Sequence, residues 1–142
     1  MTPHASEMAR LWNCSLEEVQ REPLTLAREA AATFGVVVAL KGAETWVVAP
    51  DGSSYHNTAG NSGLGTAGSG DVLAGIIAGL AARGADALQS AVWGVYLHAT
   101  AGDVLAEAVG EVGFLASEIP AQIPRLLQRY RSQATNDVRS AC

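Results

Sequence analysis

A glycine-rich segment of the chain ends in a single carboxylate at the start of an apolar stretch. The segment runs from Gly60 to Asp71, and the apolar stretch continues from Val72 to Ala82. Glycines let the main chain approach an anion closely, and the free N–H groups of a helix start carry partial positive charge. We therefore predict an anion-binding loop before a helix over 71–82, in whose field Asp71 is ionised and able to accept a proton. The residues expected to line this loop are Ala67, Gly68, Ser69 and Gly70.

Two other glycine patterns compete for the same segment. Gly63-x-Gly65-x-x-Gly68 has the spacing of the dinucleotide-binding fingerprint, but that fingerprint requires a second strand after the helix, whereas a helical pattern follows here over 85–108. The nucleoside-triphosphatase loop requires Gly-Lys before Ser or Thr, and the segment contains no lysine. A glycine-rich turn in which Asp71 only supplies a helix-terminal charge stays open as the alternative.

Composition limits the classes of protein that this chain can represent. Its 142 residues suffice for at most one domain, and 49% of them are hydrophobic against 16% that are charged. A net charge of -5 without a basic stripe argues against nucleic acid as a partner. Residues 1–10 lack an apolar signal core, and the longest apolar run is too short to span a membrane. Cys14 and Cys142 have no ligand spacing, so we expect free thiols and a cytoplasmic location.

The elements before the glycine loop are predicted to be helical and then extended. Ser15 followed by Glu18 has capping-box spacing and begins a helix that Pro23 interrupts, that resumes to about Thr33 and that Gly35 ends. Residues 36–40 form a continuous β-branched apolar run, which is typical of a strand buried on both faces. Strands over 45–49 and from residue 54 follow, separated by a turn at 50–52. This order predicts an α/β fold.

The elements after the loop are predicted to be helices. They cover 71–82, 85–108 and 118–131, the last with Ser117 as its cap, and a flexible tail follows over 132–142. Gly75 and Gly79 have a spacing that lets a helix lie close to a neighbouring element. His98 stands in a mostly apolar helix, which favours a hydrogen-bonded structural histidine over a catalytic one.

Three further segments are candidates for the same site. The segment Lys41-Gly42-Ala43-Glu44-Thr45 follows the buried strand at the sheet edge where open α/β folds place ligands, although a plain hairpin turn is an equal alternative. His4 follows a proline and precedes a short helix that begins near Glu7. Asn57 and Asn61 flank the loop entrance, where we expect them to bond its turns.

In combination these segments resemble the ADP- or ATP-dependent NAD(P)H-hydrate dehydratases, from Thr2 to about Leu127. The resemblance implies a ribokinase-like fold and repair of hydrated NADH or NADPH, with ADP or ATP as phosphoryl donor, Mg²⁺ and a homo-oligomeric assembly. It implies that the adenine nucleotide contacts Lys41, Gly42, Ala43, Glu44, Thr45 and Gly70. It also implies that His4 and Asp71 contact the hydrated dinucleotide, with Asp71 catalytic, and it assigns no residue as a metal ligand. The matching segments are Thr2-Pro3-His4 with 7–11, Leu40 to Ala43, Asn57 to Asn61 with 68–79, and Gly94 to His98.

The sequence departs from the family pattern in two ways. Ala5-Ser6 stands where the family has Pro-Gly, and the family domain is about twice as long as this chain. We therefore expect residues 1–131 to form the carboxyl-terminal half of a three-layer domain, and the strand over 36–40 to present an edge without its partner. The alternatives to the dehydratase are a ribokinase-like kinase for hydroxymethylpyrimidine, pyridoxal or a sugar, and a non-catalytic nucleotide-binding fragment.

Overall fold

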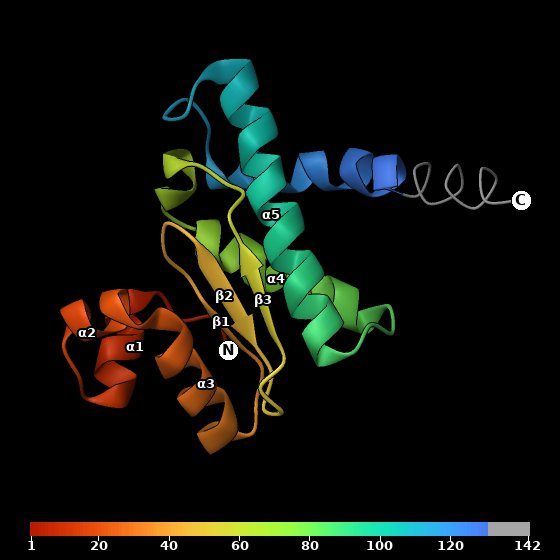
Figure 1. Cartoon of the computed structure of the whole chain (residues 1–142). Helices are drawn as coiled ribbons and strands as arrows, with labels where there is room; N and C mark the ends of the chain where they lie inside the picture. The colour runs from red at the N-terminus through yellow and green to blue at the C-terminus, as the bar shows by residue number, and fades with distance from the viewer. Residues whose placement is uncertain (131–142) are drawn as a thin grey trace, which may run out of the picture.

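A computed structural model describes residues 1–130 of the chain, and the predicted flexible tail over 132–142 lies outside the described residues. The helices and strands follow one another in an order that agrees with the predicted one (Figure 1). They are α1 (Ala5–Trp12), α2 (Leu16–Arg21), α3 (Pro23–Phe34), β1 (Val38–Leu40), β2 (Thr45–Val48), β3 (Ser54–Asn57), the 3₁₀ helix η1 (Ser62–Gly65), α4 (Ser69–Ala82), α5 (Ala87–Val109) and the 3₁₀ helix η2 (Ala116–Gln122), after which residues 123–130 are helical.

The first three helices begin and end where local side chains satisfy the main chain. Ser15 accepts a hydrogen bond from the Glu18 main-chain N–H, and the Glu18 carboxylate accepts one from the Ser15 N–H, as the capping-box spacing predicts. Pro23 occupies the first turn of α3, where its missing N–H costs no hydrogen bond. Gly35 ends α3 with a φ of 63°, a left-handed conformation that favours glycine. The predicted break and stop are confirmed.

The three strands form an antiparallel sheet in the order β1-β2-β3. Val38 lies opposite Val48, and Thr45 opposite Asn57, so the β1–β2 turn contains the segment that follows Lys41. The expectation that the strand over 36–40 lacks a partner on one edge was wrong. Met1–His4 run beside β1, where the Ala39 N–H donates to the Met1 carbonyl at 2.9 Å and the Lys41 N–H to the Pro3 carbonyl at 2.8 Å. On this side the edge of the described sheet therefore lies at residues 1–4, and β3 forms the other edge.

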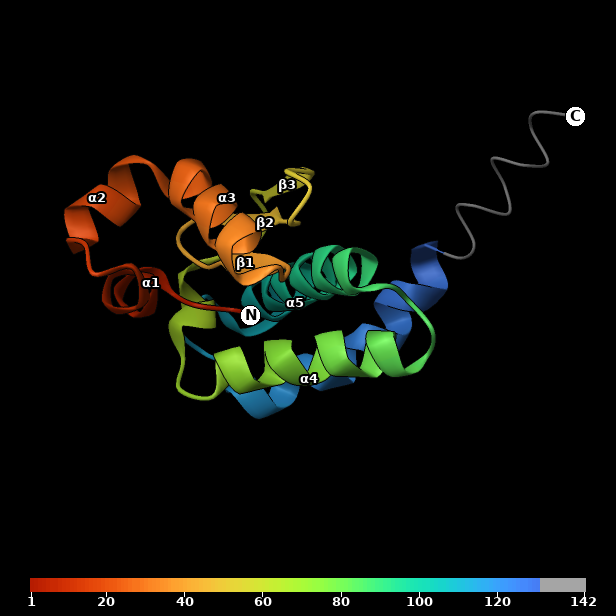
Figure 2. The ribbon, with the colours of Figure 1, turned by 90° about the horizontal axis from the view of Figure 1, so that it is seen from below.

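The sheet lies between two layers of helices, in agreement with the predicted three-layer α/β arrangement (Figure 2). Val38 and Leu40 point toward α1 and α3, where they join a buried cluster with Met8. The intervening Ala39 points to the other face, where it packs with Leu73 of α4 and with residues of α5. All three residues of β1 are buried, which confirms a strand covered on both faces for residues 38–40. The predicted start at residue 36 was wrong, since Val36 and Val37 precede the strand and Val36 is exposed.

The helices after the loop differ from the prediction at their ends. Helix α4 begins at Ser69 rather than at Asp71, so Asp71 stands within its first turn. Helix α5 begins at Ala87 because Asp86 caps it by accepting a hydrogen bond from the Gln89 N–H at 2.8 Å. The predicted close packing at Gly75 and Gly79 was wrong, since a Cβ atom built on either residue meets nothing within 4 Å.

The end of the described chain also differs from the predicted helix with a Ser117 cap. Residues 116–122 form the 3₁₀ helix η2, which contains Pro120, and Leu115 rather than Ser117 precedes its first turn. Proline lacks the N–H that an α-helix interior needs, so the tighter turn is the local solution. No helix among residues 1–130 is long and apolar enough to cross a membrane.

Candidate functional site

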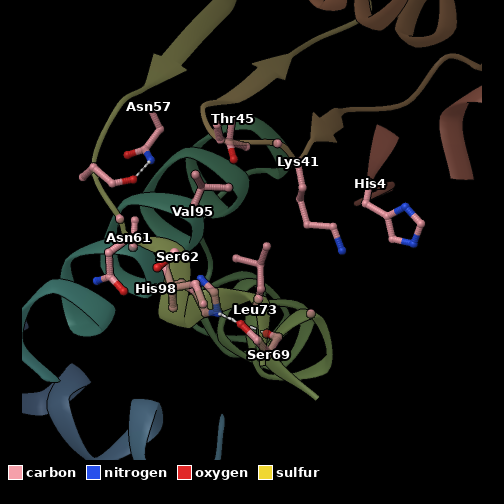
Figure 3. Close-up of a pocket in the computed structure, with 18 of the residues that line it drawn as sticks. His4, Lys41, Thr45, Asn57, Asn61, Ser62, Ser69, Leu73, Val95 and His98 are labelled. Carbon is pink, nitrogen blue, oxygen red and sulfur yellow. Dashed lines mark hydrogen bonds between the residues drawn. The ribbon is translucent and has the colours of Figure 1, made fainter. Parts of the chain in front are cut away.

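A cavity of about 660 Å³ opens between the end of β1, the glycine-rich loop and the middle of α5 (Figure 3). Its size lies within the range of small-molecule sites, which is roughly 300–1,000 Å³. The walls combine main-chain groups of the loop with a few polar side chains and with Leu73 and Val95. The polar lining residues include His4, Lys41, Thr45, Asn57, Asn61, Ser62, Thr66, Ser69 and His98, and the loop adds Gly60, Gly65 and Gly70.

Lys41 brings a positive charge to the start of α4. Its side chain extends from the end of β1 toward the loop (Figure 3), and a Cβ atom built on Gly70 would lie 3.1 Å from its Nζ atom. Among the described residues no carboxylate lies within 4.0 Å of this ammonium group. An unpaired ammonium group beside the N–H groups of a helix start suits an anionic ligand such as a phosphate.

His4 lies next to Lys41 because residues 4 and 41 pair in parallel along the sheet edge. It caps α1: its Nδ1 accepts a hydrogen bond from the Glu7 N–H at 3.2 Å, and the His4 N–H donates to the Glu7 carboxylate at 2.7 Å. The hydrogen bond from the His4 main chain lowers the pKa of Glu7 below its usual range. These bonds to the first turn of α1 therefore hold His4 in one place at the rim of the cavity.

His98 fixes the first residue of α4 to α5. Its Nε2 lies 3.0 Å from the Ser69 hydroxyl and 3.1 Å from the Ser69 carbonyl, and both residues are buried. Because a carbonyl only accepts, the second bond requires a hydrogen on Nε2. Burial lowers the pKa of His98, so the ring is neutral near pH 7. The predicted hydrogen bonding of His98 is confirmed, and the ring also lines the cavity.

The amides at the loop entrance bond its turns, as predicted. Asn57 donates from Nδ2 to the Ala59 carbonyl at 2.8 Å, and Asn61 accepts from the Gly63 N–H at 3.0 Å. The Asn57 Oδ1 atom is buried and has no hydrogen-bond partner among the described residues. Gly68 precedes α4 with a φ of 85°, which explains why glycine stands at that bend.

The structure brings most, but not all, of the predicted site residues to the cavity. Among them, the residues that line it are His4, Lys41, Gly42, Ala43, Thr45, Ser69 and Gly70. Glu44 instead points to β3, where its carboxylate lies 2.7 Å from Nε2 of His56, whose ring stacks on Trp46 with 3.9 Å between centroids. Ala67, Gly68 and Asp71 are exposed and do not line the cavity.

Sequence reasoning missed Asp103 on α5. Its carboxylate accepts hydrogen bonds from the Gly60 N–H and from the Asn61 side chain, both at 3.0 Å. The sequence does contain one sign of its importance: Asp103 is the only Asp, Glu, Lys or Arg between Asp86 and Glu107. A single charge within a long apolar helix needs a partner, but the sequence does not show which one.

Solved structures with a similar arrangement of helices and strands have the ribokinase-like fold. The chain superposes on a ribokinase-like superfamily protein from Enterococcus faecalis with a TM-score of 0.79 and 33% sequence identity, over 91% of this chain and 43% of that one. The chain also superposes on an ADP/ATP-dependent NAD(P)H-hydrate dehydratase from Bacillus subtilis that was co-crystallised with ATP and Mg²⁺. That superposition has a TM-score of 0.87 at 32% identity and covers 91% of this chain and 47% of the other. The fold is therefore ribokinase-like.

Sequence comparison narrows this class to one family. Residues 1–125 match the family model described as NAD(P)H-hydrate dehydratase, and the chain belongs to that family. It is 51% identical over 129 residues to the ADP-dependent (S)-NAD(P)H-hydrate dehydratase of Xanthomonas campestris, covering 91% of this chain and 45% of that protein. Identity to the enzyme of the same name from Neisseria meningitidis is 46%, over 84% and 40% of the two chains. The chain thus spans less than half the length of these two relatives.

Proposed function

We propose that the domain containing this chain dehydrates the hydrated form of NADH or NADPH, with ADP or ATP as phosphoryl donor. The main observation behind the proposal is that Lys41 and Gly70 line the same cavity. The cavity therefore lies between the segment after β1 and the helix start after the glycine loop. These two segments are the parts of the sequence assigned to the adenine nucleotide. Membership of the dehydratase family supports the substrate, and the cavity supports the nucleotide.

In this proposal the nucleotide lies in the cavity, held from two sides. Lys41 to Thr45 and Gly70 bind it, with the Lys41 ammonium group facing its phosphates. The loop over 67–70 binds the negative charge that develops during transfer through its free N–H groups, whereas the Ser69 N–H donates to the Thr66 carbonyl at 3.2 Å. The described residues contain no group of three or more His, Cys, Asp or Glu able to hold a metal ion. Mg²⁺ usually keeps several waters and binds substrate phosphates. When bound, it would be held mainly by the phosphates of the nucleotide and would neutralise part of their charge.

The chemistry that we assign to the chain is proton transfer, phosphoryl transfer and elimination. Asp71 takes the proton from the hydroxyl group of the hydrated nicotinamide ring, which His4 helps to hold. The hydroxyl oxygen forms a bond to the terminal phosphorus of the nucleotide as the bond to the bridging oxygen breaks. The ring nitrogen then donates its electron pair to the ring, the carbon–oxygen bond breaks, and phosphate leaves together with a ring proton. NADH or NADPH results.

Further parts of the proposal concern the setting of the reaction. Residues 1–131 act as the carboxyl-terminal part of the catalytic domain, and the assembly is a homo-oligomer in the cytoplasm. Cys14, the described cysteine, carries a free thiol, in keeping with a reducing compartment. A net charge of -5 gives no basis for a nucleic-acid partner.

The test is a repair assay on the chain alone and on the chain fused behind the amino-terminal part of the Xanthomonas relative. Hydrated NADH or NADPH is supplied with ADP or ATP, and the reduced-nicotinamide absorbance and released phosphate are followed together. In the fused protein we expect both products to rise in equal amounts, and in the chain alone we expect little or no activity. In the fused protein, a stable phosphoester without reduced nicotinamide would instead indicate a small-molecule kinase, and nucleotide binding without phosphate release would indicate a non-catalytic fragment.

A further inference from the structure

The glycine-rich loop is attached to α5 at both ends. At its far end, His98 bonds Ser69. At its entrance, one carboxylate oxygen of Asp103 accepts from the Gly60 N–H at 3.0 Å and the other accepts from Asn61 Nδ2 at 3.0 Å. The partners of Asp103 are 43 and 42 residues away in the sequence, so these bonds connect two separate parts of the chain.

In the hydrogen bonds at the loop entrance, each group can act only as a donor or only as an acceptor. The Gly60 N–H only donates, so Asp103 must present an acceptor to it. Asn61 uses its Oδ1 to accept from the Gly63 N–H at 3.0 Å, which leaves its NH₂ group to face Asp103. Asp103 therefore needs a second acceptor, and only a carboxylate offers two. Bonds to an ionised acceptor are also the stronger kind.

The surrounding packing leaves the loop little freedom to find another arrangement. A Cβ atom on Gly102, beside Asp103, would lie 2.6 Å from Leu64 Cδ2, so the loop rests directly on this turn of α5. Gly63 lies against the main chain of Glu111, where a Cβ atom would lie 1.8 Å from the carbonyl oxygen. Ser62 donates to the Glu111 carboxylate at 2.6 Å. The residues joined to Asp103 therefore stand in a close-packed wall of the cavity.

We propose that Asp103 is a positioning residue: its carboxylate fixes the entrance of the glycine loop on α5 and thereby sets how tightly the cavity binds the phosphates of a nucleotide. The link to the nucleotide rests on the function proposed above. Asp103 itself does not line the cavity. It acts through Gly60 and Asn61, which line the cavity.

Exchanging the two side chains tests this role. In D103N the new amide can still accept from the Gly60 N–H, but its NH₂ group then faces that of Asn61. In N61D two carboxylates stand about 3 Å apart, a repulsion that is more costly than the amide mismatch. The double variant N61D/D103N restores a donor opposite an acceptor in every bond, because the NH₂ group and the carboxylate merely change places.

The readout is hydrogen exchange of the loop amides in the 142-residue chain, measured without ligand. We expect exchange at Gly60 and Gly63 to be about tenfold faster in D103N, the factor that loss of one charge-assisted bond gives. It should be faster still in N61D, and within about threefold of the unsubstituted chain in the double variant. Glu107→Gln, an exposed change one turn further along α5, is the matched control and should leave exchange unchanged.

ADP affinity, measured by calorimetry on the same four variants, should follow the same order. Unchanged exchange in D103N, or a double variant as fast as N61D, would overturn the anchoring role of Asp103. Altered exchange with unchanged ADP affinity would overturn its link to the nucleotide. If neither the unsubstituted chain nor its fusion to the amino-terminal part of the Xanthomonas relative binds ADP, the proposed function fails, whereas the exchange series still decides whether Asp103 anchors the loop.

Discussion

The two sides of the candidate site differ in how firmly the described residues hold them. On the binding side, Ser69 is 4% exposed, is bonded to a buried histidine, and begins a helix whose preceding loop is attached to α5. On the side assigned to the chemistry, Asp71 is exposed only two residues further along α4, and the His4 side chain is about half exposed. The same helix start therefore carries one enclosed face and one open face.

The difference indicates which function each side can serve within these residues. Recognition of a phosphate needs fixed main-chain N–H groups, and these are fixed by α5, which is distant in the sequence. Proton abstraction needs a carboxylate held against its substrate with water excluded, and the described residues place no cover over Asp71. We infer that nucleotide binding depends on the described residues. Turnover depends, in addition, on groups that cover Asp71.

The substitution Asp71→Asn is expected to give the largest difference between turnover and ADP affinity. This change removes the proposed base but keeps the shape, so turnover should fall by a factor of about 10²–10⁴ while ADP affinity stays within about twofold. Turnover is followed in the repair assay on the fused protein, and ADP affinity by calorimetry on both proteins. Glu107→Gln, which neutralises an exposed carboxylate elsewhere, should change neither quantity. Near-normal turnover of Asp71→Asn would remove Asp71 from the mechanism.

The next largest effect is expected inside the binding side, from Gly63→Ala. A Cβ atom there would lie 1.8 Å from the Glu111 carbonyl oxygen and 2.7 Å from the ring of Phe114, which is buried. Overpacking of this kind costs about 1–3 kcal/mol, and the loop that moves belongs to the proposed phosphate site. We therefore expect a lower free energy of unfolding in urea and weaker ADP binding in calorimetry.

Gly65→Ala is the matched control for this change, since it adds the same methyl group two residues further along η1. A Cβ atom on Gly65 meets nothing within 4 Å, and the residue is exposed. Its effect on the free energy of unfolding should stay within about 0.5 kcal/mol. Equal effects of the two substitutions would show that the loop is not held against residues 111–114.

A smaller effect, confined to one range of pH, is expected from His98. Burial lowers its pKa from the ordinary value of 6.5, so the unfolded chain binds the proton first as the pH falls. The stability that neutral His98 contributes is full above pH 6.5 and is lost as the pH falls through the lowered pKa. Unfolding between about pH 5 and pH 7 should thus depend less on pH in His98→Gln than in the unsubstituted chain.

Two other sets of groups must be separated from this effect. Burial also lowers the pKa of the Met1 amine, but that group is common to both proteins and cancels in their difference. The carboxylates whose pKa hydrogen bonds lower, such as Glu7 and Glu18, affect stability only below their ordinary value of 4.5. Identical pH profiles for the two proteins would mean that His98 has the same pKa in the folded and unfolded chain.

The fold could be predicted where a local signal decides the structure. The capping box at Ser15, the proline at position 23 and Gly35 fixed the ends of the first helices, because each acts on main-chain groups within one turn. The partner of β1 could not be predicted, because Met1–His4 are too few to show a periodic pattern and pair with it through main-chain bonds. Pairing of that kind carries no side-chain signature.

The site could be predicted where chemistry requires particular residue types in one segment. Lys41 and Gly70 meet as the motifs suggested, and His98 makes its bonds to Ser69. Asp103 was missed, because its role lies in two bonds to a loop more than forty residues earlier. The orientation of Glu44 was also not foreseen, since its pairing with His56 depends on the register of β2 and β3.

The smallest expected effect concerns the outer face of α4, which continues the open side beyond Asp71. Gly75 and Gly79 are exposed, and a Cβ atom on either meets nothing within 4 Å, whereas on the inner side a Cβ atom on Gly94 of α5 would lie 2.4 Å from Ile77. Glycine in an exposed helix interior is roughly 0.5–1 kcal/mol less favourable than alanine. Gly75→Ala and Gly79→Ala should therefore each raise the free energy of unfolding by about that amount, and Gly94→Ala should lower it.

Light scattering at several concentrations shows whether this outer face stays open in solution. If the two α4 substitutions stabilise the chain at every concentration and leave its mass unchanged, the face is free and the glycines serve no contact within these residues. If they destabilise the chain, or shift it from an oligomer to a monomer, another copy packs closely on that face, because a methyl group is harmful only where a neighbouring surface approaches. The second outcome would contradict the contrast between the two sides, since the open side would then be covered in the assembly.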